Sequence, residues 1–313
     1  MSSQLDLSIP PKRHEKKIGK QKEYSAQIQK HFSLNGVCQS SDQNVELYYE
    51  VYGTGSQKVI LIDGLASQLD DYQFMVLHLV TTYDCSVCVF QNRHLKWSTG
   101  KMGRFTTSLG AADTLAIVDK LGWEKVIVGG MSMGGMITLE FATRYPERCS
   151  RLYLGCTTAG FFPSCRVICD MLKSLTMSDP VALAKLNGDL FFTKEFLDSD
   201  FAAYGVKGSE FILLPPEQLY SQEEVCPSNV SFLHMLACVT HRVSDARLKT
   251  LKESGMKIVI VHGTEDVMIP YKSSVRLAEL TGGKLFTLEG EGHVYNVSDI
   301  EGTNRTLDEL MRD

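Results

Sequence analysis

The chain of 313 residues is 43% hydrophobic and 22% charged, with a formal net charge of −5 at pH 7. This length suits one large α/β domain that carries an inserted subdomain. The negative balance argues against a phosphate-binding surface, because nonspecific nucleic-acid binding requires clustered cations. We therefore expect a small-molecule partner and no nucleic acid.

The cysteines indicate free thiols in a reducing compartment. Nine cysteines are an odd number without regular spacing, which favours a cytoplasmic location over a disulfide framework. Cys85 and Cys88 form a C-x-x-C, but the surrounding YDCSVCVF alternates like a strand, so we interpret them as buried structural thiols. Cys165 and Cys169 lack a second matching pair, and we expect neither a metal site nor a cofactor.

Residues 1–43 differ in composition from the rest of the chain. They are polar and locally basic (PPKRHEKKIGKQK), which predicts a disordered basic N-terminal tail. A nuclear-localisation signal or a contact with an anionic membrane is the alternative reading of this charge run. No segment is apolar enough to span a bilayer, so we expect no stable membrane insertion.

Residues 44–159 alternate between strand and helix patterns. VELYYEVYG predicts an antiparallel strand, and it is followed by short apolar runs typical of strands buried on both faces: KVILID, CSVCVF, KVIVGG and RLYLG. Helical patterns cover residues 107–121 and 134–145. We therefore predict the first part of an α/β core, with a mostly parallel central sheet and helices on both faces.

The pattern changes in residues 160–249, where helical, Met- and Phe-rich segments replace the apolar strands. The strand patterns KIVIVHG and KLFTLEG then return within residues 250–313, which we assign to the second part of the core. The intervening segment is predicted to be a helical cap or lid over one end of the sheet. The alternative is a set of extra helices packed on the core.

The segment GGMSMGG lies between the predicted strand KVIVGG and the predicted helix GGMITLEFATRY. Gly130, Ser132 and Gly134 match the G-x-S-x-G pattern in the strand-to-helix context that this motif requires. A tight turn strains the serine backbone, and flanking glycines let neighbouring backbone approach without a Cβ clash. Free N–H groups at the start of the helix favour developing negative charge beside the serine.

A nucleophilic serine requires a base and a carboxylate that orients the base. In this topology both follow the serine, each just beyond a late strand. Asp266 comes shortly after KIVIVHG, with Glu265 as the alternative carboxylate, and His293 lies in the glycine-rich loop after KLFTLEG. Other titratable groups are interpreted as structural or as helix-surface and capping residues: His262, Asp113 and Asp119.

With these elements in order, the sequence resembles the α/β-hydrolase family, in particular its serine esterases, lipases and aminopeptidase-like enzymes. The resemblance covers about residues 45–295 and rests on GGMSMGG, YPERCSRLYLG, HGTEDVMIP and GEGH. It implies an α/β-hydrolase fold with Ser132 as nucleophile, Asp266 as orienting acid and His293 as general base. Relatives that open epoxides or remove halogens have Asp at the elbow, so a serine there implies acyl transfer.

The resemblance also implies an oxyanion hole built from the backbone N–H groups of Met133 and Leu65. In the family the loop that carries Leu65 usually begins His-Gly, whereas this chain has Asp63 and Gly64. An ionised Asp63 facing the site would lower activity or shift its pH dependence. We favour the alternative, in which Asp63 turns away or is paired.

Asp63 and Gly64 are also candidates for substrate contact, together with three further residues. His94 replaces a glycine of the family's Asp-x-Arg-Gly element, and it either lines the pocket mouth or is a loop histidine without a role. Phe161 and Phe162 belong to a group of apolar side chains in the insertion that could bind an acyl chain or an aromatic ester. Core packing explains these residues equally well.

These observations predict hydrolysis of carboxylic esters, acyl-lipid-like or aryl, through an acyl-enzyme intermediate. A peptidase, a carbon-carbon hydrolase or an acyltransferase would use the same triad. A non-catalytic binding protein of the same fold is the remaining alternative, motivated by Asp63 and by the N-terminal tail. The triad does not identify the substrate, because the shape of the inserted segment sets specificity.

Overall fold

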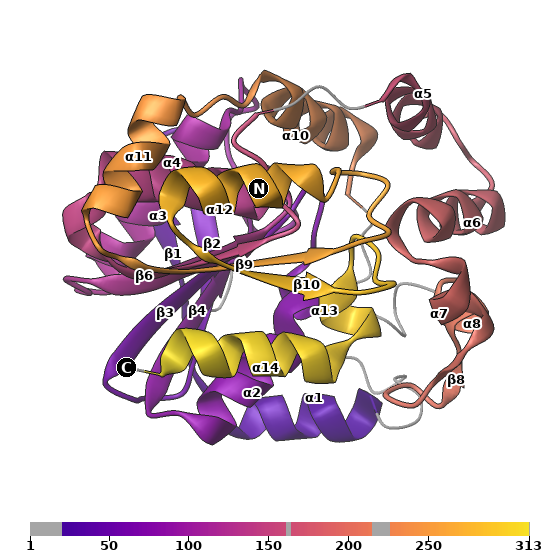
Figure 1. The fold of residues 1–313 in the computed structure, drawn as a ribbon, viewed down its shortest axis with the longest axis horizontal. Helices are drawn as coiled ribbons and strands as arrows, with labels where there is room; N and C mark the ends of the chain where they lie inside the picture. Colours follow the sequence, from indigo (N-terminus) through magenta and orange to yellow (C-terminus); the bar gives the residue numbers. More distant parts are fainter. Residues whose placement is uncertain (1–20, 161–163, 215–225, 313) are drawn as a thin grey trace, which may run out of the picture.

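The computed structural model describes residues 21–160, 164–214 and 226–312, and its main feature is an eight-stranded sheet in the order β1-β2-β4-β3-β5-β6-β9-β10 (Figure 1). All neighbours from β4 to β10 pair in parallel, whereas β2 is antiparallel to both β1 and β4. The prediction of a mostly parallel sheet is confirmed. The strands are β1 (Phe32–Gln39), β2 (Glu46–Tyr52), β3 (Gln57–Ile62), β4 (Cys85–Phe90), β5 (Val126–Met131), β6 (Cys149–Gly155), β9 (Lys257–Gly263) and β10 (Lys284–Leu288).

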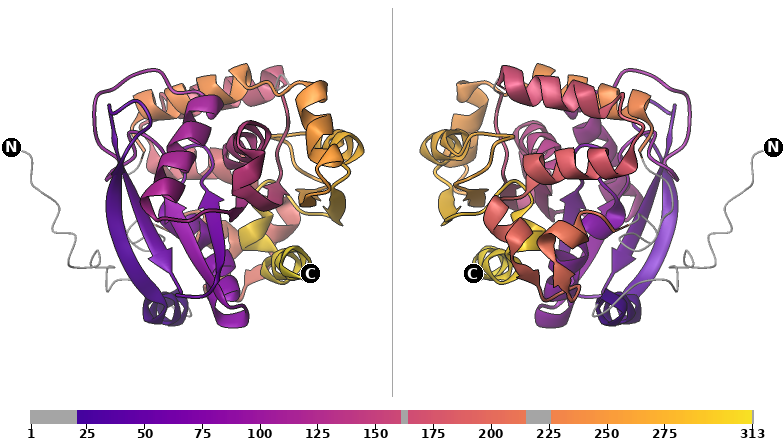
Figure 2. Two further views of the ribbon diagram at one scale, coloured as in Figure 1. Left: turned by 90° about the vertical axis from the view of Figure 1, so that its left-hand side faces the viewer. Right: turned by 90° about the vertical axis from the view of Figure 1, so that its right-hand side faces the viewer.

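Helices cover both faces of this sheet (Figures 1 and 2). One face carries α3 (Thr107–Lys120), α4 (Met133–Arg144), α11 (Asp245–Glu253) and α12 (Lys272–Thr281). The other face carries α1 (Gln21–Lys30), α2 (Gln73–Thr82), α13 (Tyr295–Ser298) and α14 (Ile300–Met311). Short 3₁₀ turns precede α2 and β6: Leu69–Tyr72 and Pro146–Arg148.

The central strands are apolar without alternation because both of their faces are buried. Every residue of β4 and β5 is buried. In β3, Ile60 and Ile62 pack into the core beneath α3 and α4, whereas Val59 and Leu61 pack into the core beneath α2 and α14. This period of two explains how one short apolar run supplies two hydrophobic cores.

The predicted disordered tail is wrong for its second part, since residues 21–39 form α1 and β1. Residues 1–20 lie outside the described part of the chain. Tyr24 and Ile28, four residues apart, face the core: Ile28 is buried and the Tyr24 ring meets Phe74 of α2 edge-on at 5.0 Å. β1 is held by backbone pairing with β2, and this long-range pairing is not visible in the local sequence pattern.

The inserted segment lies across one end of the sheet (Figure 1). Its elements are α5 (Cys165–Ser174), α6 (Pro180–Phe191), α7 (Lys194–Asp198), the hairpin β7 (Asp200–Phe201) and β8 (Val206–Lys207), α8 (Gly208–Phe211) and α10 (Ser228–Thr240). Phe196, Phe201 and Tyr204 pack against Phe74 of the core in one aromatic cluster. Within the predicted insertion the short hairpin is an unexpected element, and α11 packs with the core helices α4 and α12.

No helix in the described ranges is both long enough and apolar enough to cross a bilayer.

Candidate active site

Ser132 occupies a strained turn between β5 and α4. Its backbone angles are φ 53° and ψ −122°, outside the regions that side-chain-bearing residues prefer. The turn is held by β6 and the loop after it: Ser132 N–H donates to the Gly155 carbonyl at 2.9 Å, and the Thr157 hydroxyl donates to the Ser132 carbonyl at 2.8 Å. Ser132 is half-buried, whereas the residues on either side of it are buried.

The glycines around Ser132 meet a steric requirement. A Cβ on Gly134 would lie 1.9 Å from the Ile62 carbonyl oxygen, and one on Gly130 would lie 2.4 Å from the Gly134 carbonyl carbon. Such contacts are impossible without movement of the backbone. The sequence prediction that glycine is needed on both sides of the serine therefore has a direct geometric cause.

Asp266 and His293 meet in the loops that follow β9 and β10. Nδ1 of His293 lies 2.7 Å from Oδ2 of Asp266. The other carboxylate oxygen accepts hydrogen bonds from the backbone N–H groups of Met268 and Ile269, at 2.8 and 3.0 Å. These bonds fix the carboxylate so that it can hold the imidazole in one orientation.

Asp266 and His293 shift each other's pKa in opposite directions. Burial alone would raise the pKa of Asp266, but His293 and a hydrogen bond from His262 outweigh it and hold that pKa well below its usual value. Burial likewise opposes a charged His293, yet the Asp266 carboxylate raises the pKa of the imidazole. His262 itself is buried between Ser274 and the Ile269 carbonyl, in keeping with a structural role.

Parallel pairing brings these loops to one edge of the sheet. Met131 is paired with Gly155, Gly155 with Val261, and Gly263 with Leu288, so the carboxyl ends of β5, β6, β9 and β10 adjoin. In the described part of the chain Ser132 Oγ makes no hydrogen bond with His293. Such bonds are often long before substrate binds.

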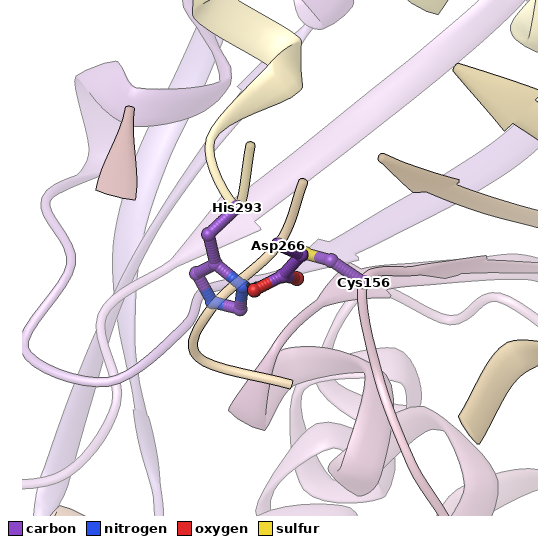
Figure 3. A group of neighbouring side chains, drawn as sticks. All are labelled: Cys156, Asp266 and His293. Atoms are coloured by element: carbon purple, nitrogen blue, oxygen red, sulfur yellow. Dashed lines mark hydrogen bonds and ion pairs between the residues drawn. The ribbon is translucent and has the colours of Figure 1, made fainter. Parts of the chain in front are cut away.

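Cys156, which directly follows β6, is the site residue that sequence analysis missed. Its buried thiol lies beside His293 and Asp266 (Figure 3). The thiol also interacts with the backbone of Ser132. Its position immediately after a buried parallel strand was the available signal, because functional side chains of such sheets gather at the carboxyl ends of strands.

The loop after β3 lies beside the nucleophile. A Cβ on Gly64 would be 3.8 Å from Cβ of Ser132, so the loop that carries Leu65 adjoins the serine at Gly64. Met133 is the first residue of α4, where backbone N–H groups lack intrahelical acceptors. Both predicted oxyanion donors thus belong to segments that adjoin Ser132.

Asp63 is completely buried, and neither of its carboxyl oxygens has a hydrogen-bond partner among the described residues. The predicted alternative of a paired Asp63 is therefore wrong. Burial, followed by the charges of Asp71 and Asp70, raises its pKa well above the usual value. Burial thus favours the uncharged form of this carboxyl, the form that adds no negative charge beside the loop of Gly64 and Leu65.

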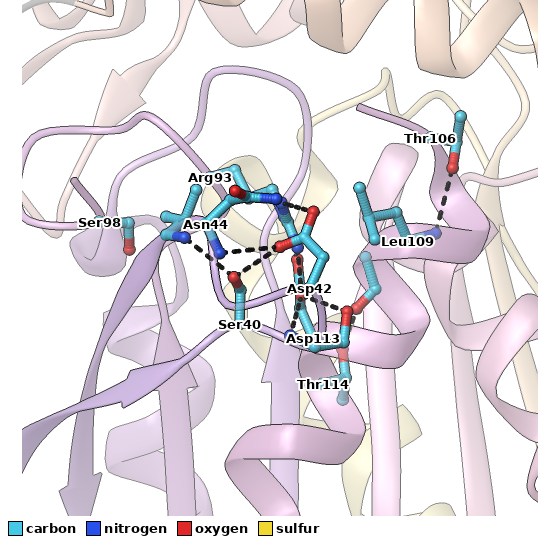
Figure 4. Close-up of polar contacts among 12 residues, drawn as sticks. Ser40, Asp42, Asn44, Arg93, Ser98, Thr106, Leu109, Asp113 and Thr114 are labelled. Atoms are coloured by element: carbon cyan, nitrogen blue, oxygen red, sulfur yellow. Dashed lines mark hydrogen bonds and ion pairs between the residues drawn. The ribbon is translucent and has the colours of Figure 1, made fainter. Parts of the chain in front are cut away.

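The loop after β4 supports the oxyanion loop from the side. Asn92 donates a side-chain hydrogen bond to the Asp63 carbonyl at 3.0 Å. The Arg93 guanidinium pairs with Asp113 of α3 at 2.5 and 2.7 Å and with Asp42 at 2.9 Å (Figure 4). The prediction that Asp113 is a helix-surface or capping residue is wrong, because it is a buried partner of Arg93.

His94 has a left-handed backbone, φ 66°, and its N–H donates to the Ser98 carbonyl at 2.9 Å. Its side chain is half-buried, and burial and then Arg93 lower its pKa. Its contact with substrate stays a prediction. Phe161 and Phe162 lie outside the described residues.

The cap contacts the loop that carries His293. The carbonyl of Phe191, the last residue of α6, accepts hydrogen bonds from the backbone N–H groups of His293 and Val294 at 3.0 and 3.2 Å. The Phe191 ring lies nearly parallel to the imidazole, with centroids 6.1 Å apart. Among the described phenylalanines of the insertion, Phe191 contacts the site, whereas Phe192, Phe196 and Phe211 pack with one another.

Comparisons with known proteins agree with this architecture. A thermophilic esterase structure from Thermogutta terrifontis has a TM-score of 0.72 and 19% identity, covering 90% of this chain and 98% of its own, which shows the fold alone. Hydrolase YugF of Bacillus subtilis, itself uncharacterised, is 23% identical over 260 residues, 80% of this chain and 88% of that protein. Homoserine O-acetyltransferase of Thermus thermophilus is 41% identical over 64 residues, 20% of this chain, and the match spans only 17% of that enzyme. The model of the α/β hydrolase fold matches residues 58–298, and the chain therefore belongs to the α/β-hydrolase fold family.

Proposed function

We propose that this protein hydrolyses carboxylic esters of small molecules through an acyl-enzyme intermediate, with Ser132 as nucleophile, His293 as general base and Asp266 as orienting acid. The observation that carries the proposal is the strained Ser132 turn at the same sheet edge as the 2.7 Å Asp266–His293 pair. Nucleophilic serine catalysis needs this combination of groups.

In this mechanism Oγ of Ser132 attacks the ester carbonyl while Nε2 of His293 accepts the hydroxyl proton. The resulting oxyanion receives hydrogen bonds from the backbone N–H groups of Met133 and Leu65. His293 then gives the proton to the departing alcohol, leaving an acyl group on Ser132. Water, activated by His293, attacks this ester and releases the carboxylic acid.

An apolar acyl or aryl group is the proposed substrate feature. The Phe191 ring beside His293 supports this choice. All nine cysteines are free, five of them buried, and this supports a cytoplasmic location.

Labelling with a fluorophosphonate probe tests the proposal. We expect covalent modification at Ser132, no modification of the Ser132→Ala variant, and turnover of short-chain aryl esters by the wild-type protein alone. A panel of esters of graded chain length then defines the acyl preference. An unlabelled but folded wild-type protein would contradict the proposal.

Acyl transfer to an alcohol is the second candidate, favoured by the local 41% identity to homoserine O-acetyltransferase. It would use the same acyl-enzyme, with an alcohol in place of water. Adding increasing amounts of an alcohol acceptor to the ester assay separates the two. A transferase yields mainly the new ester, whereas a hydrolase continues to release the acid.

A further inference from the structure

Three different metal-ligand types converge on the base of the proposed triad. The thiol of Cys156, a carboxylate oxygen of Asp266 and an imidazole nitrogen of His293 all lie within 4.8 Å of one another (Figure 3). All three residues are buried. The ester mechanism proposed above uses the aspartate and the histidine and leaves the thiol without a task.

The backbone holds Cys156 firmly in this position. Its N–H donates to the Val261 carbonyl of β9 at 2.8 Å, and its φ of 35° turns the chain sharply at the end of β6. Asp266 is fixed by two backbone hydrogen bonds from its own loop. The end of β6 therefore fixes Cys156, and the tight loop after β9 fixes Asp266.

The spacing is close to what zinc requires. Zinc binds sulfur at about 2.3 Å, imidazole nitrogen at about 2.0–2.1 Å and carboxylate oxygen at about 2.0–2.2 Å in a tetrahedron, so its ligand atoms are roughly 3.3–3.7 Å apart. Nδ1 and Oδ2 are now closer than this, at 2.7 Å, because they share a proton. A shift of the order of 1 Å would open the space for an ion.

We propose that Cys156, Asp266 and His293 form an inhibitory site for a thiophilic divalent cation such as Zn²⁺. A thiolate, a carboxylate and a neutral imidazole carry two negative charges, which the ion balances. The thiol proton is released to solvent on binding. A thiolate ligand favours Zn²⁺ over Mg²⁺ and Ca²⁺, which prefer oxygen ligands.

Inhibition follows from either way of binding His293. If the ion binds Nδ1, it replaces the bond to Asp266 and the proton of the neutral imidazole moves from Nδ1 to Nε2, which then cannot accept the proton of Ser132. If it binds Nε2, it occupies the lone pair of the base directly. This consequence rests on the proposed function, whereas metal binding itself does not.

Binding is tested with Co²⁺, whose bonds to thiolates give a characteristic charge-transfer absorption. We expect one Co²⁺ per full-length chain, displaced by Zn²⁺, with the absorption lost in Cys156→Ser and Cys156→Ala. The matched control is Cys165→Ser/Cys169→Ser, which removes two exposed cysteines one helical turn apart on α5. Absorption that persists without Cys156, or that disappears in the control, would overturn the site. Thermal unfolding of each variant verifies that it is folded.

Inhibition is tested on the ester substrate. We expect Zn²⁺ to inhibit the wild-type protein and the α5 control alike, a chelator to restore activity, and Mg²⁺ or Ca²⁺ to have no effect. In the Cys156 variants the Zn²⁺ concentration for half-inhibition should rise at least ~10-fold, since even second-shell changes at metal sites cost 10- to 100-fold in affinity. Equal inhibition of wild type and Cys156→Ser refutes the inference. If the protein lacks esterase activity, the Co²⁺ titration still decides the binding site independently.

Discussion

Asp63 shows how burial changes the meaning of a residue. From the sequence, a carboxylate at the start of the oxyanion loop threatens the stabilisation of negative charge. In the fold the side chain is completely buried, without a hydrogen-bond partner among the described residues, and its pKa is raised well above 3.8. A neutral acid costs stability through its desolvation and unmet hydrogen bonds, but it does not oppose the oxyanion.

We predict that Asp63→Asn stabilises the protein at alkaline pH. The unfolded carboxyl ionises near its ordinary pKa of 3.8, whereas the folded one keeps its proton to higher pH. Because the folded state then binds more protons, stability is lost as pH rises above about 4. The amide of the substituted asparagine is neutral and does not titrate. Thermal unfolding at several pH values should show a gain for the variant at pH 8 that shrinks toward pH 4.

The control for this prediction is Asp245→Asn, which changes an exposed aspartate. The change in unfolding temperature that Asp245→Asn causes should not increase between pH 4 and pH 8. A destabilised Asp63→Asn at every pH would show that the carboxyl has a specific structural task.

At the level of elements, helix α10 of the cap is joined to the oxyanion loop through His234. The imidazole is completely buried, and burial lowers its pKa to about 4, so it is neutral at pH 7. Nδ1 accepts the Ala66 N–H, and Nε2 lies at the same distance, 3.3 Å, from the Arg93 carbonyl, to which it can donate. The predicted role of the cap thus extends beyond covering the site: one of its helices positions the loop that follows Gly64.

We predict that His234→Ala lowers kcat by between about 10- and 100-fold with a smaller effect on KM. Loss of one oxyanion donor typically costs 10²- to 10³-fold, and a loosened loop should cost less than a lost donor. His234→Asn, which keeps a hydrogen-bonding side chain, should recover part of kcat. The measurement is steady-state kinetics with a short-chain aryl ester.

His241→Gln is the matched control, because His241 follows α10, is buried, and bonds to Thr107 of α3 and not to the oxyanion loop. It should lower the unfolding temperature and leave kcat nearly unchanged. Equal losses of kcat in both variants would mean that α10 acts only through overall stability.

Across the whole molecule, a buried arginine connects segments that are far apart in the sequence. Arg93 follows β4, Asp113 lies on α3, and Asp42 lies in the turn between β1 and β2. The same turn belongs to the region predicted to be disordered. The segment around Arg93 also contacts the site. Its neighbour Asn92 donates to the Asp63 carbonyl, and the Arg93 carbonyl lies 3.3 Å from Nε2 of His234. Arg93 therefore ties the N-terminal part of the fold to the loops around the site.

We predict that Arg93→Met destabilises the protein by about 3–5 kcal/mol, because it leaves the buried Asp113 without its charged partner. Arg276→Met is the control. It removes an exposed pair with Asp245, in which both side chains are about half exposed, and should change stability by at most about 1 kcal/mol. Urea unfolding of both variants measures the difference. The backbone N–H and the hydroxyl of Ser41 also donate to Asp113, at 3.2 and 3.1 Å. Similar small effects would show that these two bonds satisfy Asp113 alone.

Local patterns in the sequence were sufficient for the architecture and for the main candidate residues. Apolar runs of strand length alternate with segments of helical periodicity, and this alternation predicts a parallel sheet. The spacing of the apolar residues indicates which faces of each strand or helix are buried. GGMSMGG between such elements marks the elbow, since close backbone approach excludes a Cβ at Gly130 and Gly134. Asp266 and His293 could be named because they follow strands whose carboxyl ends adjoin.

Only the tertiary structure decided features that depend on contacts between distant segments. The polar helix α1 is ordered by packing on α2, and β1 by pairing with β2. The raised pKa of Asp63, the pairing of Arg93 with Asp113, and the approach of Cys156 to His293 likewise follow from burial and from neighbours brought together by the sheet. The cost of burying a polar group depends on its partners in space, and no local pattern records those partners.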